Sequence, residues 1–62
     1  MKQDILRNQV KIVKATEDIM YKDLAEYLEI HTNSFYNWLK GYYDLSYEKA
    51  KSLESLITDM LD

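Results

Sequence analysis

Residues 21–41 read YKDLAEYLEIHTNSFYNWLKG and hold the most informative pattern of the chain. Apolar residues recur at helical spacing on both sides of a short polar break. Leu24 and Leu28 precede this break, and Phe35 and Trp38 follow it as an i, i+3 pair. The spacing predicts two short helices joined by a turn of three or four residues, which is a helix-turn-helix.

Helical periodicity also covers both ends of the chain. The four expected helices span residues 3–15, 21–28, 32–40 and 47–61. Gly41 is placed to end the third helix in a left-handed conformation, and Ser46 is placed to cap the fourth. The chain has no proline and one glycine, too few turn residues for a strand-turn-strand fold. We therefore expect a single all-α domain over residues 1–62, a compact four-helix unit with a central helix-turn-helix.

The same periodicity predicts which faces are buried. In the first helix the inward face holds Ile5, Leu6, Val10 and Val13. In the fourth helix it holds Tyr47, Ala50, Leu53, Ile57 and either Met60 or Leu61. The centre of the core is expected to contain Leu24, Leu28, Phe35, Leu53 and a largely buried Trp38. Leu56 and Leu61 are left over after the inward face of the fourth helix is assigned. They form either an exposed dimer contact, with Leu56 pointing outward, or part of a small core that uses every apolar residue.

Length and composition limit the stability and the location of the protein. A chain of 62 residues is near the lower limit for independent folding, and without cysteine it has no disulfide or cysteine-ligated zinc to stabilise it. We expect a folding free energy of only about 3–5 kcal/mol. The longest uncharged run, residues 30–39, is too short to cross a bilayer, and no secretory signal is present. The sequence therefore predicts a cytoplasmic protein with no membrane segment.

Charge is distributed unevenly along the chain. Eight Lys and Arg against 11 Asp and Glu give a net charge of −3, which does not favour a nucleic-acid partner. The charges of residues 1–41 balance, and the acidic excess lies entirely in residues 42–62. Residues 30–43 contain no carboxylate. The third helix and its flanks therefore form an acid-free polar surface, which is either a DNA-facing surface or a solvated helix face.

This pattern resembles the Cro/C1-type helix-turn-helix family of lambdoid phage repressors, Cro proteins and their small relatives. The match runs without a gap over residues 21–41, and Asp44-Leu45-Ser46 with the helix 47–61 fits the family's C-terminal part. The resemblance implies a lambda-repressor-like fold and a small phage-type transcriptional regulator, such as a repressor. It also implies a double-stranded DNA operator as the partner, with the helix 32–40 in the major groove.

The resemblance also implies roles for single residues. Base-reading positions hold Thr32, Asn33, Ser34 and Asn37, with Tyr36 between them near a sugar, a phosphate or a thymine methyl group. Phosphate-contacting positions hold Lys40 and Tyr21, the latter assisted by Lys22. Independently of any family, asparagine pairs with adenine through two hydrogen bonds, and serine or threonine can address several bases.

Three positions depart from the family pattern. Glu29 stands where the turn often has glycine, and a left-handed glutamate costs about 1 kcal/mol. Met20 and His31 stand where the two motif helices usually have Ser or Thr caps. Asp18 or the backbone must therefore cap the first motif helix.

Nothing in the sequence predicts an enzyme, a metal site, a cofactor or a small-molecule substrate. His31 is the only histidine, and no ligand cluster at metal-binding spacing surrounds it. Asp23 and Glu26, three residues apart on a short helix, indicate a solvated face. No nucleophile–base pair is available.

Several interpretations stay open at this point. Arg7, Lys11 and Lys14 share a helix face that either meets solvent or flanks the DNA backbone. Of Tyr42 and Tyr43, one packs under the loop and the other reaches a phosphate or a partner. A homodimer through the helix 47–61 would bind two half-sites. The alternative function is a protein-interaction module, an antirepressor or an inhibitor of a host protein, with that acidic helix as its contact surface.

Overall fold

The computed structural model describes residues 3–61 and consists of four helices. They are α1 (Asp4–Thr16), α2 (Tyr21–Tyr27), α3 (Thr32–Leu39) and α4 (Tyr47–Leu61). No strand occurs within the described residues, so the all-α prediction is confirmed. The helix ends differ from the expected ones by at most one residue.

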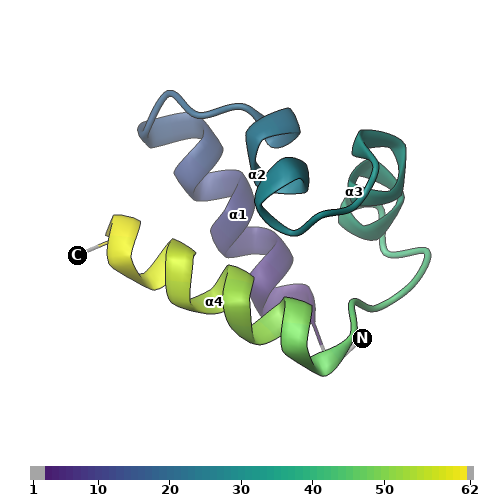
Figure 1. Ribbon diagram of the computed structural model, residues 1–62. Coiled ribbons are helices and arrows are strands. Elements are labelled where there is room, and N and C mark those ends of the chain that lie inside the picture. Colours follow the sequence, from purple (N-terminus) through teal and green to yellow (C-terminus); the bar gives the residue numbers. More distant parts are fainter. Residues whose placement is uncertain (1–2, 62) are drawn as a thin grey trace.

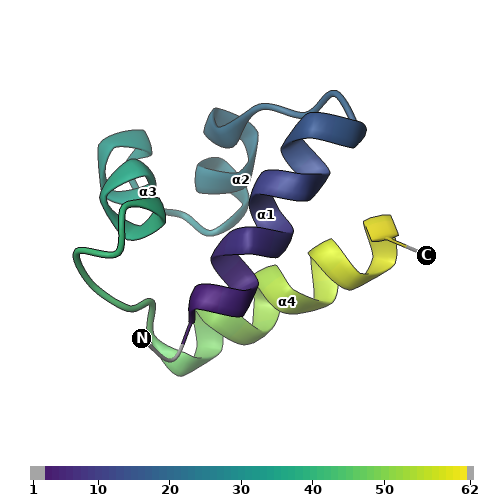
Figure 2. The same cartoon turned by 180° about the vertical axis from the view of Figure 1, so that it is seen from behind.

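The helices pack as two pairs, α1 against α4 and α2 against α3 (Figure 1). The turn 28–31 joins α2 to α3, and the loop 40–46 leads from α3 to α4. Seen from the front and from behind, α3 lies at one side of the molecule and the C-terminal end of α4 at the other (Figures 1 and 2). The second helix of the helix-turn-helix is therefore at the edge of the domain.

The expected core centre is confirmed. Phe35, Trp38 and Leu53 are completely buried, and Leu24 and Leu28 are nearly so. The rest of the buried apolar cluster comprises Leu6, Val10, Val13, Ala25, Leu39, Leu45 and Ile57. All four helices contribute to one cluster, as a domain of this size requires.

Two apolar residues that were expected to face inward are exposed. Ile5 is 74% exposed and Tyr47 is 76% exposed. Ile5 lies about 100° around α1 from Leu6, and Tyr47 about 120° around α4 from Leu53, so neither shares the buried face. The sequence pattern was wrong at these two positions because a residue at the margin of a helix face fits either side.

The leftover leucines of α4 take different places. Leu56 is partly buried and packs against the core, so its expected outward position was wrong. Leu61 is 47% exposed. The core therefore uses Leu56, and Leu61 stays available at the surface.

Arg7 departs most clearly from its expected place. Only 3% of it is exposed, so it neither meets solvent nor flanks DNA. Its guanidinium donates hydrogen bonds to the backbone oxygens of Trp38 and Tyr43 and to the carboxylates of Asp4 and Asp44. These partners supply the acceptors that make burial of a charge tolerable. Helix periodicity could not reveal them, because three of the four lie more than 30 residues away.

The helix caps agree partly with expectation. The Ser46 hydroxyl accepts a hydrogen bond from the Lys49 N–H at 3.3 Å, as predicted for α4. Neither Met20 nor His31 caps its helix through a side chain. The Met20 carbonyl accepts the first hydrogen bonds of α2. Of the two alternatives for capping this helix, the backbone therefore serves and the Asp18 side chain does not.

Left-handed residues end the two motif helices. Gly41 has a φ of 87°, and the N–H of Tyr42 bonds to the Asn37 carbonyl behind it, as expected for a glycine C-cap. Glu29 has a φ of 60° and ends α2 in the same way, with the Ile30 N–H bonded to the Ala25 carbonyl. A side chain thus occupies a conformation that glycine adopts at lower cost.

We expect Glu29→Gly to raise the free energy of unfolding by about 0.5–1 kcal/mol, because it removes the left-handed strain. The matched control is Glu26→Gly, an exposed position within α2, which should lower that free energy by about 1 kcal/mol through lost helix propensity. Urea denaturation followed by circular dichroism measures both. Equal losses at the two positions would contradict the assignment.

No helix among residues 3–61 is long and apolar enough to cross a membrane.

Candidate nucleic-acid interface

The outer face of α3 brings together the residues that were expected to read bases. Phe35, Trp38 and Leu39 hold the inner face of the helix in the core. The opposite face is therefore fixed toward solvent, and Asn33 and Asn37, one turn apart, are both exposed on it. Of the other predicted site residues, Lys22, Tyr36 and Lys40 are exposed, and Tyr21, Thr32 and Ser34 are half-buried.

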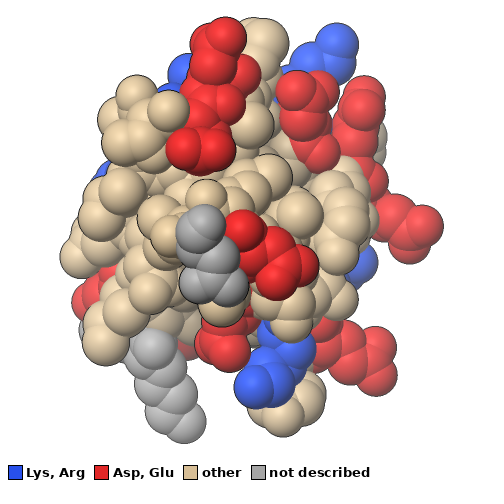
Figure 3. Space-filling model, turned by 90° about the vertical axis from the view of Figure 1, so that its left-hand side faces the viewer, with Lys and Arg blue, Asp and Glu red and all other residues tan. Residues whose placement is uncertain are grey.

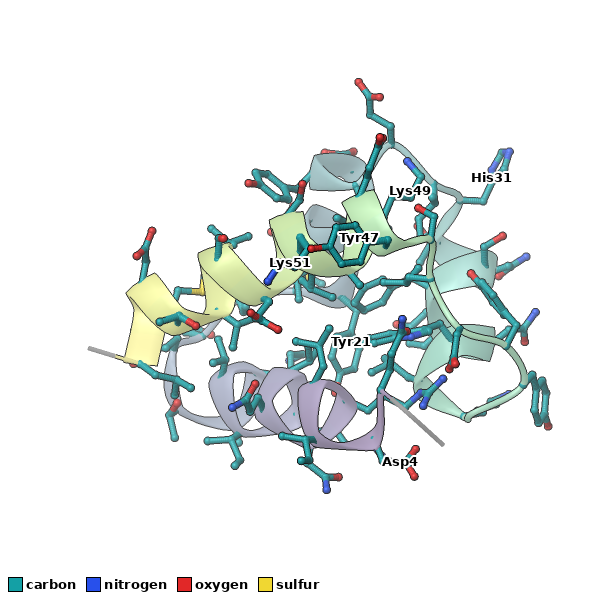
Figure 4. The ribbon with its side chains drawn as sticks, turned by 90° about the horizontal axis from the view of Figure 1, so that it is seen from below. Asp4, Tyr21, His31, Tyr47, Lys49 and Lys51 are labelled. Atoms are coloured by element: carbon teal, nitrogen blue, oxygen red, sulfur yellow. The ribbon has the colours of Figure 1, made fainter. Side chains whose placement is uncertain are left out.

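One edge of this face is built from aromatic rings. Tyr21, at the start of α2, lies 5.9 Å from the Phe35 ring and 5.7 Å from the Tyr36 ring, centroid to centroid. The Lys14 ammonium lies 5.8 Å from the centre of the Tyr21 ring. Figure 4 shows Tyr21 among the helices, where burial and, second, the neighbouring Tyr36 raise its pKa above the usual value. A tyrosine hydroxyl is protonated at neutral pH even at its ordinary pKa, so Tyr21 can donate its hydrogen to an acceptor.

The loop after α3 forms the other edge. The Tyr43 hydroxyl donates a 2.8 Å hydrogen bond to the Ser34 carbonyl in the first turn of α3. Tyr42 remains 72% exposed, and the Lys40 ammonium lies 5.9 Å from its ring centre. Neither tyrosine is buried under the loop: Tyr43, 37% exposed, is tied to α3 by this hydrogen bond, and Tyr42 lies at the surface beside a cation.

The start of α3 is open to solvent. His31, Thr32, Asn33 and Ser34 line a shallow hollow there. Figure 4 shows His31 pointing outward, away from the body of the domain. Because no side chain of the described residues caps α3, its first N–H groups remain free for outside acceptors.

Charged side chains lie both around α3 and on the side of the molecule away from it. Lys40 lies within the acid-free stretch, the Lys14 ammonium lies over the Tyr21 ring, and Lys49 donates to the Leu28 carbonyl at the turn before α3. Figure 3 shows the side away from α3, where carboxylates are spread widely over the surface. Residues 30–43 contain no carboxylate, while Glu26 and Glu29 line a hollow with His31 at the start of α3.

Two residues that hold this interface in place were missed by the sequence analysis. The Trp38 indole N–H and the Leu45 backbone N–H both donate to the Gln3 Oε1, at 2.7 and 2.9 Å. The Gln3 Nε2 returns a 3.0 Å bond to the Leu45 carbonyl. Gln3 and Arg7 therefore tie the start of α1 to the end of α3 and its loop. No local sequence signal could have found them.

Comparisons of the chain with protein-family models, with curated proteins and with solved structures found no significant match. Within residues 3–61 no group of three or more His, Cys, Asp or Glu is placed to hold a metal ion. The functional assignment therefore rests on the geometry and chemistry of α3 and its surroundings.

Proposed function

We propose that this protein binds double-stranded DNA sequence-specifically and acts as a small cytoplasmic transcriptional regulator of the phage-repressor kind. The observation that carries the proposal is the outer face of α3. This face is at the edge of the domain, contains no carboxylate, and presents Asn33 and Asn37 one turn apart. The protein acts by binding alone, occupying an operator, without a cofactor.

The dimensions of α3 suit this role. An α-helix with its side chains is about 10–12 Å wide, and the major groove of B-DNA is about 12 Å wide. With α3 in the groove, Thr32, Asn33 and Ser34 lie at base edges, since the N-terminal residues of a recognition helix enter deepest. Asn37 follows one turn later, while Lys40 reaches the phosphate backbone.

The Tyr21 edge provides the second backbone contact. Its protonated hydroxyl and the exposed Lys22 lie at the start of α2, and Lys14 adds a positive charge beside the ring. Hydrogen-bond donors and cations that flank a recognition helix position the protein on the duplex without reading sequence. Tyr36, which packs on Tyr21, is placed between the two sets of contacts.

Selection from a random duplex pool tests the proposal. Wild-type protein should enrich a short motif, and Asn33→Ala should lose preference at one position of it. Ser55→Ala, an exposed change on α4, is the control and should enrich the wild-type motif. A folded wild-type protein that enriches no motif would contradict DNA recognition.

A second candidate is a protein-interaction module, such as an antirepressor or an inhibitor of a host protein. The net charge of −3 and the carboxylates on the side away from α3 favour it (Figure 3). This candidate predicts no enriched motif in the same selection, so one experiment separates the two functions.

Dimerisation through α4 would let two copies read two half-sites about one helical turn of DNA apart. Leu61 is the exposed apolar residue at the end of α4, so Leu61→Glu should weaken self-association and leave the thermal melt unchanged. Leu56→Glu is unsuitable because Leu56 packs against the core. Sedimentation equilibrium measures the association. A monomer at high concentration that binds one half-site as tightly as two would contradict the dimer.

A further inference from the structure

Arg7 is a buried charge that the proposed DNA contacts do not use. Its Nε donates to the Trp38 carbonyl in the last turn of α3. One Nη donates to the Tyr43 carbonyl at 2.7 Å and to Asp44 at 3.0 Å, and the other donates to Asp4 at 2.9 Å. The guanidinium carbon lies 5.2 Å from the centre of the Trp38 ring. The guanidinium therefore contacts the end of α3, its loop and the start of α1.

These contacts are concentrated at the C-terminal end of α3. The helix has eight residues, and the Gly41 C-cap and the buried Leu45 already fix the path of the chain that leaves it. Gln3 adds a second link at the same end, through the Trp38 indole and the backbone of Leu45. Two polar side chains from the start of α1 therefore add to the apolar packing that holds the C-terminal end of α3.

We propose that Arg7 is a positioning residue of the DNA interface, which sets the orientation of α3 against α1 and thereby the sequence discrimination. The inference rests on the proposed function. Base contacts need their groups held within about 0.5 Å and 10–20°, whereas the attraction of phosphates for cations tolerates larger displacements. Loosening the end of α3 should therefore reduce discrimination more than it reduces affinity for random DNA.

The test compares Arg7→Met and Arg7→Lys with wild type, at a low temperature where circular dichroism shows each to be folded. The measured quantity is the ratio of affinities for the selected duplex and for a random duplex. Arg7→Met should lower this ratio at least about tenfold, which is the loss of discrimination expected when one bidentate base contact is lost. It should change the affinity for the random duplex less than about twofold. Arg7→Lys keeps the charge but not the planar fork, so its ratio should lie in between.

Controls separate positioning from stability. Ile57→Val and Ile57→Ala change a buried position of α4 and cause a small and a large loss of stability. Both should keep the wild-type ratio of affinities for the selected and the random duplex. Asp44→Ala removes one Arg7 partner from the loop and should lower the ratio partly, so it carries the test where Arg7→Met does not fold.

The outcomes are distinguishable. An Arg7→Met or Asp44→Ala ratio equal to that of the Ile57 controls overturns the positioning role and leaves DNA binding intact. A wild-type protein with no preferred duplex overturns both the inference and the proposed function.

Discussion

Trp38→Ala is expected to unfold most of the protein at room temperature. Trp38 is fully buried, its ring lies 5.4 Å from that of Phe35, and its indole N–H donates to Gln3. Removing a buried aromatic ring of this kind costs about 3–5 kcal/mol, which equals the whole stability expected for a domain of this length. Urea denaturation measures the loss of stability of Trp38→Ala. The tryptophan emission maximum of the native wild type tests whether Trp38 is buried.

The matched control is Tyr42→Ala, an aromatic residue that is 72% exposed. It should change the free energy of unfolding by less than about 0.5 kcal/mol. A Trp38→Ala variant with the wild-type transition midpoint, or a native wild-type emission maximum typical of a fully exposed tryptophan, would contradict the described core.

Asn33→Ala and Lys40→Ala are expected to weaken DNA binding in different ways. Loss of the Asn33 base contact should cost about 1–3 kcal/mol on the preferred duplex and much less on random DNA. Loss of Lys40 should weaken both duplexes alike and reduce the salt dependence of binding by about one unit per protomer. Fluorescence anisotropy over a salt series measures both effects.

Each variant has a counterpart elsewhere on the surface. Asn8→Ala changes an exposed asparagine of α1, and Lys51→Ala changes an exposed lysine of α4. Neither should alter the affinity for either duplex or the salt dependence of binding. If Asn33→Ala and Lys40→Ala bind every duplex as the wild type does, the face of α3 is a solvated surface and the protein-interaction candidate gains support.

Local patterns in the sequence predicted most of the fold. The helix ends, the buried Trp38, the left-handed Gly41 and the Ser46 cap all follow from spacing and from the intrinsic preferences of single residues. The periodicity failed at Ile5 and Tyr47, because a helix face has no sharp margin.

The candidate site was predictable to a smaller extent. The exposed face of α3, including Asn33 and Asn37, follows from helical periodicity, and its role in DNA binding stays a prediction. The supports of that face could not be found in the same way. Arg7 reads as a surface charge beside Lys11, and its acceptors become visible only when the chain is folded.

The links from Gln3 and Arg7 to the end of α3 also bear on the order of folding. They join residues 31 to 42 positions apart, so closing them fixes a long stretch of chain. The contacts between α2 and α3 are close in sequence and should form earlier. If the α1 links form after the rate-limiting step, substitution of Arg7 accelerates unfolding and leaves the folding rate nearly unchanged. The lifetime of the native state, rather than the speed of reaching it, would then depend on this arginine.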